Sequence, residues 1–555
     1  MTQTKETGPF KGTAAPVKQR YFDPAHHVPF PLDYQLQQLV KKIKGKMASK
    51  PKEGDEYQIE ELVMVDAIQR LGHEYYFQED INAALRKWSK VEEGGHNLHD
   101  VALRFRLLRQ AGYNVQADTF DNFKNEDGKF KQELCKDTKG LLSLFEASEL
   151  NILGDEILDE AAYFTWNLLK SSLSNIHENA AVIIKTTLIN PHHKSLPRLT
   201  AKKELPNFET SLNFLHDCSD TQDWIKEIQD LARTDINKAQ ITLQSETTQI
   251  SKWWKELGMA EVLEHARNEP IKWHMWSSVA LPSPDMAELR VELTKAISFI
   301  YIIDDIFDVY GKLEELILFV EAVNRWEYAD MNGLPNYMKI CLKALFDTTA
   351  EMSKKVYINH GWNAEGYLQN VWSELCNAFL VEARWFANER LPTTDEYLKN
   401  GLVSSGVYVV FGTLFSLLGE AKHLWNAHPE IVSVTGTILR LSDDLGSAKD
   451  ENQDGHDGSF LACYMNEHDG SSDEIARECV VEMISDAWKR LNEQCLSHSP
   501  FSSDLKIAFL NLARMIPVMY SYDDNHRLPV LEKHMKSLLY EETNHTLSIS
   551  NVGEL

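Results

Sequence analysis

An apolar stretch that ends in three aspartates constrains this chain more than any other segment. Residues 296–303 are apolar except for Ser298, and Asp304, Asp305 and Asp308 follow directly. A helix that is apolar on nearly all sides belongs in the centre of a helical core. Carboxylates at the end of such a helix are costly unless they are exposed or paired. The segment therefore predicts a buried central helix with a polar site at its C-terminal end.

Most of the remaining chain also predicts helices. Apolar residues recur at three- and four-residue spacing in 59–71, 98–112, 141–150 and 161–176, which is the period of an amphipathic helix. Glycine and proline mark many of the breaks between such segments. We find no convincing period-two alternation of the kind that indicates strands. The expected fold class is all-α.

The chain of 555 residues is long enough for two large domains. Residues 1–30 are polar, contain four prolines and lack helical periodicity, so we expect an arm there. Three prolines in residues 188–210 indicate an inter-domain region, and we place the boundary near residue 220. A helical domain of structural role is expected over 31–220, and a second helical domain, which carries the acidic clusters, over 221–555.

Charge and hydropathy exclude several classes of partner. The chain has 57 Lys and Arg against 83 Asp and Glu, a net charge of −26. This balance disfavours binding to nucleic acid and to anionic membrane surfaces. The longest apolar candidate, residues 407–418, is too short to span a membrane and is interrupted by Gly412, Thr413 and Ser416. We therefore expect a core helix there and no membrane insertion.

Cysteine usage and the N-terminus indicate the compartment. The seven cysteines include no CxxC pair, which favours free thiols in a reducing compartment. The first residues lack an apolar signal region, and residues 1–27 contain one arginine and no serine, unlike most transit peptides. The expected location is the cytosol, with the plastid as the alternative. No heptad stretch indicates a coiled coil, and a monomer is expected.

Asp304 and Asp308 share one face of the expected helix because they are four residues apart. Like charges at this spacing repel, and a hard cation that prefers oxygen ligands would remove the repulsion, with a diphosphate as its other partner. The alternative is an ordinary acidic helix end that faces solvent. The spacing alone does not decide between the two, because short acidic motifs often match by chance.

A second acidic cluster favours the cation site. Asp443, Ser447 and Glu451 stand at i, i+4 and i+8, which places two carboxylates and a hydroxyl on one helical stripe. Such an oxygen-only set suits Mg²⁺ or Mn²⁺. Arg440 precedes Asp443 by one turn, and its guanidinium suits phosphate oxygens. The two clusters are expected to face each other across a helical bundle.

Together these residues resemble the two metal-binding motifs of a plant class I terpene synthase. Residues 68–72 and 103–109 resemble the N-terminal domain of that family, and residues 251–255 resemble the start of its catalytic domain. The resemblance covers roughly residues 30–545. It implies a two-domain all-α chain, with an N-terminal helical barrel and a C-terminal class I terpenoid synthase bundle.

The resemblance implies a set of metal ligands and the substrate they hold. Asp304, Asp308, Asp443, Ser447 and Glu451 would bind three Mg²⁺ ions. These ions would hold the diphosphate of a prenyl diphosphate and promote its ionisation to an allylic cation. Mn²⁺ is the alternative metal.

Arginines of the family contact the diphosphate directly. Arg440 and Arg267 match two of them, whereas Asp305 stands at a position that is less often a direct metal ligand. Arg267 corresponds to the first arginine of an Arg-x-Arg motif, but Glu269 stands where the second is expected. The arginines are therefore expected to hold the diphosphate less firmly than in a typical cyclase.

The departures from the family pattern resemble one subgroup of it. The chain lacks the N-terminal tandem arginines and tryptophan of many cyclic-monoterpene synthases, since it has only Arg20 there and its first tryptophan is Trp88. This absence, with Glu269 and the segment 454–458, resembles the linalool and nerolidol synthases that make acyclic alcohols. In such enzymes water captures the allylic cation at its tertiary carbon.

The pocket is expected to be apolar and aromatic, because aromatic faces stabilise cations. Trp276, Tyr301, Tyr408 and Tyr522 are the candidate pocket aromatics, and residues 520–524 match a lid loop of the family. Packing alone is the competing role for each ring.

The leading interpretation is a terpene synthase that makes nerolidol from farnesyl diphosphate, linalool from geranyl diphosphate, or both. A cyclase of the same family is the first alternative. A prenyl-chain-elongating transferase is disfavoured because Ser447 stands in a ligand position where such enzymes usually repeat the aspartate motif. A non-catalytic isoprenoid-binding protein is disfavoured because all five expected ligands are present.

Overall fold

The computed structural model describes residues 30–48, 59–91, 97–216, 223–264, 266–328, 333–420, 429–447, 458–496, 501–521 and 528–541. Within these ranges the elements are helices, and the extended backbone pairs only at the isolated bridge between Lys124 and Phe130. The predicted all-α class is confirmed.

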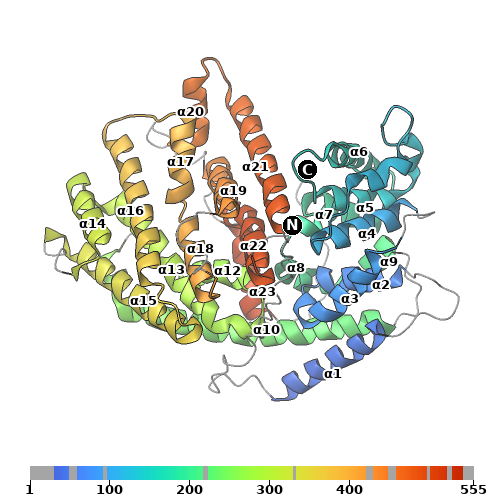
Figure 1. Cartoon of the computed structure of the whole chain (residues 1–555), viewed down its shortest axis with the longest axis horizontal. Helices are drawn as coiled ribbons and strands as arrows, with labels where there is room; N and C mark the ends of the chain where they lie inside the picture. Colours follow the sequence, from blue (N-terminus) through green and yellow to red (C-terminus); the bar gives the residue numbers. More distant parts are fainter. Residues whose placement is uncertain are drawn as a thin grey trace, which may run out of the picture.

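The N-terminal helices form one group on the right of Figure 1. Three apolar clusters lie between them, of which the largest includes Leu62, Phe77 and Trp88. The side chain of Asn97 accepts a hydrogen bond from the backbone N–H of Asp100 and so caps one of these helices. The helices are α1 (Phe30–Met47), α2 (Glu60–Arg70), α3 (Gln78–Trp88), α4 (Leu98–Gln110), α5 (Thr138–Ser148), α6 (Glu156–Ser172), α7 (Glu178–Ile189), α8 (Pro197–Glu204) and α9 (Phe208–His216).

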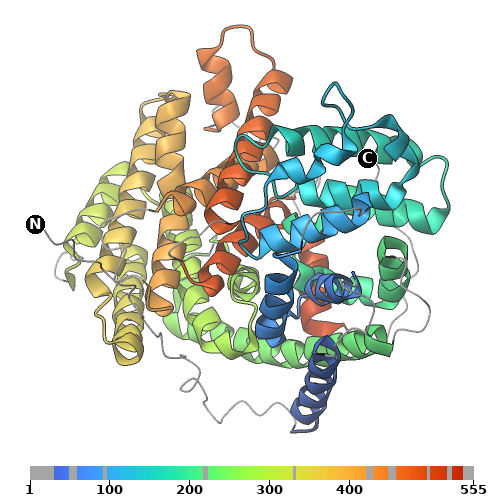
Figure 2. The ribbon, with the colours of Figure 1, turned by 45° about the vertical axis from the view of Figure 1, so that its right-hand side comes forward.

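A single long helix, α10 (Asp223–Leu257), runs beneath both halves of the molecule (Figures 1 and 2). Its first turns, with Trp224 and Ile236, belong to the N-terminal apolar core, whereas Trp254 belongs to the core of the C-terminal half. The boundary near residue 220 thus falls just before a helix that both halves share. The division into domains at that point stays a prediction.

The C-terminal helices surround one large apolar cluster. They are α11 (Met259–Val262), α12 (Pro270–Ala280), α13 (Ala287–Asp305), α14 (Leu313–Arg325), α15 (Asn336–His360), α16 (Glu365–Ala387), α17 (Thr394–Ser404), α18 (Val407–Leu417), α19 (Glu430–Ser447), α20 (Phe460–Glu467), α21 (Asp473–Leu496), α22 (Ser503–Met519) and α23 (Pro529–Tyr540). Helix α13 packs against α10, α12, α15 and α18, and most of residues 296–303 are buried. The predicted central helix is confirmed.

The stretch Thr394–Leu417 is long and apolar enough to cross a membrane by length and composition, but 67% of its most apolar part is buried inside the protein. It consists of α17 and α18, which Gly406 separates with a positive φ of 74°. Among the described residues it is the one stretch with this property. The two helices are therefore buried in the core. A core helix was the expectation for residues 407–418.

Polar contacts fix the last helices against the N-terminal half. His193 Nε2 lies 2.7 Å from Oδ1 of Asn492 on α21, whose amide nitrogen donates to the carbonyls of Glu149 and Asn151. On α22, Arg514 donates from Nε to the carbonyl of His193 at 2.6 Å. Burial lowers the pKa of His193 to about 3, so its ring is neutral at physiological pH.

We expect Gly406→Ala to destabilise the protein more than Gly470→Ala. Both glycines have positive φ, 74° and 86°, so alanine costs about 1–2 kcal/mol of backbone strain at either position. A Cβ at Gly406 would also lie 2.6 Å from Cγ2 of Ile300, whereas a Cβ at Gly470 would meet nothing within 4 Å. Scanning calorimetry should show the larger fall in Tm for Gly406→Ala. Equal falls would contradict the close contact with Ile300.

Candidate active site

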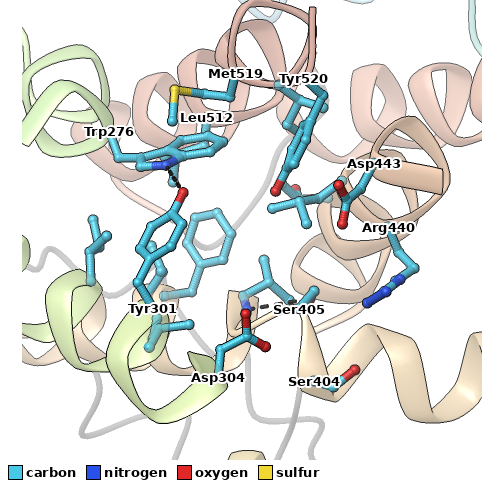
Figure 3. Close-up of a pocket in the computed structure, with 18 of the residues that line it drawn as sticks. Trp276, Tyr301, Asp304, Ser404, Ser405, Arg440, Asp443, Leu512, Met519 and Tyr520 are labelled. Carbon is cyan, nitrogen blue, oxygen red and sulfur yellow. Dashed lines mark hydrogen bonds between the residues drawn. The ribbon is translucent and has the colours of Figure 1, made fainter. Parts of the chain in front are cut away.

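A cavity lies at the C-terminal end of α13, enclosed by α12, α13, α17, α18, α19 and α22 (Figure 3). Its apolar wall consists of Trp276, Ile297, Ile300, Val407, Val410, Phe411, Leu439, Leu512, Ile516 and Met519. Its polar lining consists of Arg267, Lys272, Tyr301, Asp304, Ser404, Ser405, Thr435, Arg440, Asp443 and Tyr520. This division suits a ligand with an apolar chain and an anionic head group.

Arg267 binds both Asp304 and Asp305 of the first acidic motif, but only Asp304 lines the cavity. Asp304 lines the cavity, whereas Asp305 is only 5% exposed. Asp305 accepts hydrogen bonds from the backbone N–H and from Nε of Arg267, at 2.7 and 2.6 Å. The same guanidinium donates to Asp304 at 2.5 Å and lies 5.0 Å from the centre of the Tyr301 ring. Arg267 is thus fixed at the mouth of the cavity.

Asp308 follows on a single π-helical turn, η7 (Ile306–Tyr310), that ends the central helix. Such turns often occur at functional sites. Asp308 is exposed and is not among the residues that line the cavity. Desolvation and the negative charges of Asp304 and Glu382 raise its pKa to about 7.

The second acidic motif lies on α19 opposite the first. Asp443 lines the cavity, and Asp444 is turned away from it and is 2% exposed. Burial and the charges of Asp444 and Asp304 raise the pKa of Asp443 to about 7, although Arg440 opposes the shift. The backbone of Ser447 forms the last turn of α19, and Glu451 lies outside the described residues.

The described carboxylates could bind a divalent cation if other ligands complete its coordination shell. Asp304 and Asp443 face one cavity from two helices, and their mutual repulsion contributes to the raised pKa of Asp443. A cation between them would favour the ionised forms. Within the described residues, no three His, Cys, Asp or Glu side chains form a metal-binding group. Ser447, Glu451 or substrate oxygens would therefore have to contribute.

Of the other predicted site residues, some line the cavity and others do not. Trp276 and Tyr301 line the cavity, and Trp276 Nε1 donates to the Tyr301 hydroxyl at 3.0 Å (Figure 3). Arg440 lines it from α19. Tyr408 is on α18 but does not line this cavity; its charged neighbour is Glu374. Tyr522 lies outside the described residues.

Two residues at or near the cavity, Glu382 and Lys272, belong to no motif that we identified in the sequence. Glu382 of α16 accepts hydrogen bonds from Ser404 Oγ at 2.6 Å and from the Asn400 amide at 3.2 Å, and its charge acts on Asp308. Lys272 lines the cavity and forms an ion pair with Glu269 at 3.1 Å. The i, i+3 spacing of this pair is a signal that could have shown where the charge of Glu269 is balanced.

The described chain is all-α, and a cavity that suits a metal ion lies among the helices of its C-terminal half. This arrangement is that of the class I terpenoid synthase fold. Comparison with known families agrees. A family model described as "Terpene synthase, N-terminal domain" matches residues 17–188, and one described as "Terpene synthase family, metal binding domain" matches residues 255–490.

Relatives extend over most of the chain. A probable terpene synthase of Ricinus communis is 50% identical over 493 residues, which are 87% of this chain and 85% of the relative. An (E)-nerolidol synthase of Cannabis sativa is 47% identical, over 86% of this chain and 88% of the relative. A chloroplastic S-(+)-linalool synthase of Arabidopsis thaliana is 44% identical, over 92% and 88%. The chain belongs to the plant terpene synthase family.

Other similar proteins have other products. A chloroplastic tricyclene synthase of Antirrhinum majus is also 44% identical, over 92% of this chain and 87% of the relative. The crystal structure of isoprene synthase from Populus x canescens, in complex with three Mg²⁺ ions and dimethylallyl-S-thiolodiphosphate, is 33% identical. It matches with a TM-score of 0.83 over 92% of this chain and 97% of that one.

We expect the protein to bind Mg²⁺ more weakly at acidic pH than at basic pH. Without metal the Asp443 carboxyl has a raised pKa of about 7, so below that pH a proton competes with the cation. Calorimetric titration with Mg²⁺ should give roughly tenfold weaker binding at about pH 6 than at about pH 8. In Asp443→Asn this pH dependence should shrink but persist in part, because the pKa of Asp308 is also raised to about 7. Equal affinities of the unmodified protein at both pH values would contradict the assignment of Asp443 as a metal ligand.

Proposed function

We propose that the protein ionises a prenyl diphosphate with the help of Mg²⁺ and captures the allylic cation with water. The product is an acyclic tertiary alcohol, nerolidol from farnesyl diphosphate or linalool from geranyl diphosphate. The observation that carries the proposal is the pairing of Asp304 and Asp443 across one cavity whose remaining wall is apolar. Similarity to a nerolidol synthase and a linalool synthase supports the choice of product.

The metal ligands in this proposal are Asp304, Asp308, Asp443, Ser447 and Glu451. Mg²⁺ bound there would neutralise the leaving diphosphate and lower the barrier to breaking the allylic C–O bond. Arg267 and Arg440 lie on different elements at the same cavity, and their guanidinium groups donate hydrogen bonds to diphosphate oxygens. Lys272 adds a positive charge near Glu269, which offsets part of the charge reversal in the Arg-x-Arg motif.

The prenyl chain occupies the apolar part of the cavity. Trp276 and Tyr301 present aromatic surface to it, and aromatic faces stabilise carbocations without reacting with them. Their mutual hydrogen bond of 3.0 Å keeps both rings in place. The tertiary carbon of an allylic cation is only two bonds from the carbon that carried the diphosphate, so the captured water attacks close to the charged end of the cavity.

A cyclase is the second candidate. The tricyclene synthase of Antirrhinum majus is as similar to this chain as the linalool synthase, at 44% identity. The two candidates share the metal site and differ in whether the cation cyclises before it is quenched. Identification of the reaction products therefore distinguishes the two candidate functions.

The plastid is the compartment we propose for the protein. The linalool and tricyclene synthase relatives are both named chloroplastic, whereas the cytosol expected from composition has no support in these names. A fusion of the whole chain to a fluorescent protein, expressed in leaf cells, should coincide with chlorophyll fluorescence. Diffuse cytosolic fluorescence would contradict the plastid and favour a farnesyl substrate.

Purified protein with Mg²⁺ should convert geranyl or farnesyl diphosphate into linalool or nerolidol, identified by chiral gas chromatography–mass spectrometry. Asp304→Ala and Asp443→Ala should lower turnover by at least roughly a hundredfold, since each removes a proposed metal ligand. Asp347→Ala, which alters a surface carboxylate paired with Lys343, is the control and should leave turnover unchanged. Mainly cyclic hydrocarbons would favour the cyclase, and full turnover by either variant would contradict the metal site.

A further inference from the structure

The second aspartate of each acidic motif has the same role in the fold. Asp305 and Asp444 are both buried and turned away from the cavity. Each accepts a hydrogen bond from an arginine at the cavity and from a backbone N–H that is distant in sequence. For Asp305 the arginine and the N–H both belong to Arg267. For Asp444 they belong to Arg440, at 3.3 Å, and to Phe460, at 2.9 Å.

Arg440 has a further partner on α17. The Tyr397 side chain is 4% exposed, and its hydroxyl accepts a hydrogen bond from Arg440 Nε at 3.1 Å and donates one to Asp444 Oδ1 at 2.9 Å. The guanidinium carbon of Arg440 lies 5.5 Å from the centre of the Tyr397 ring. These three side chains form a closed group between α17 and α19.

The backbone of α17 also confines the arginine. A Cβ at Gly401 would lie 3.0 Å from Cδ of Arg440, so the aliphatic part of the arginine packs directly against this helix. The contacts with Tyr397 and Asp444 use Nε. In Figure 3 the guanidinium extends from α19 toward the space near Ser404.

We propose that Tyr397 and Asp444 are positioning residues that hold Arg440 in the orientation in which it binds a diphosphate. An arginine side chain loses much rotamer freedom when it is fixed in one geometry. Contacts made on folding remove that cost from the binding step. The proposal rests on the proposed function only in taking a diphosphate as the ligand.

The test uses the full chain and inorganic diphosphate with Mg²⁺ as the probe, with binding measured by calorimetry. Tyr397→Phe keeps the ring and removes the hydroxyl. It should weaken diphosphate binding roughly three- to tenfold, the effect of one or two hydrogen bonds. Arg440→Gln should weaken it at least as much. Tyr397→Phe should then have no further effect in the Arg440→Gln background, because it acts through Arg440.

The chain offers a matched control in Tyr328→Phe. The Tyr328 hydroxyl donates to Asp347 at 2.7 Å, so this variant also breaks a tyrosine–aspartate hydrogen bond, but Tyr328 is 53% exposed and does not line the cavity. Diphosphate binding should be unchanged. Asp444→Asn, which keeps the side-chain size, is the second variant and replaces Tyr397→Phe if thermal unfolding shows that the latter is not folded. It should raise the KM for a prenyl diphosphate more than it lowers kcat.

Unchanged diphosphate binding by both variants would overturn the proposal. So would an equal weakening by Tyr397→Phe in the unmodified and the Arg440→Gln proteins, since Tyr397 would then act independently of Arg440. A failure of the proposed function can be distinguished from a failure of this proposal. In the first case the unmodified protein would turn over no prenyl diphosphate, while the binding of inorganic diphosphate by each variant would still be measurable.

Discussion

The concentration of negative charge at the end of a buried helix is the constraint on which the rest of the site depends. Helix α13 brings Asp304 and Asp305 to the edge of the apolar core, and α19 brings Asp443 to the opposite side of the same cavity. Burial penalises the charges of Asp305 and Asp443. Arg267 balances part of the first motif and Arg440 part of the second. The cavity-facing carboxylates keep enough mutual repulsion to make a divalent cation the natural partner.

The central helix and its acidic end could be predicted from sequence because both are local patterns. An all-round apolar segment has one stable place in a helical protein, and charged residues that follow it must lie at the edge of the core. The spacing of Asp443, Ser447 and Glu451 is equally local, although the structure describes only the beginning of that stripe. The family resemblance, carried by these motifs, was confirmed over most of the chain.

The supporting contacts could not be predicted, because they join residues that no pattern relates. Tyr397 and Asp444 are 47 positions apart and meet only because α17 packs on α19. Glu382 reaches the site from α16 through Ser404 and Asn400. Tyr408 shows the reverse case, since its place on an apolar helix near the site did not decide which side of that helix faces the cavity. Helix rotation and contact between distant segments are decided by packing.

Helix α22 has two faces with different neighbours. Leu512, Ile516 and Met519 follow one side and form part of the cavity wall, while Arg514, two residues after Leu512, binds the carbonyl of His193 in the N-terminal half. Leu512, Arg514 and Ile516 lie in the same helical segment, before Pro517, so a shift of Arg514 moves the two cavity-wall residues with it. The half of the chain without acidic motifs therefore contributes to the shape of the reaction chamber. Chimaeras that exchange this half between related synthases would inherit its influence on product distribution without any change to the residues that touch the substrate.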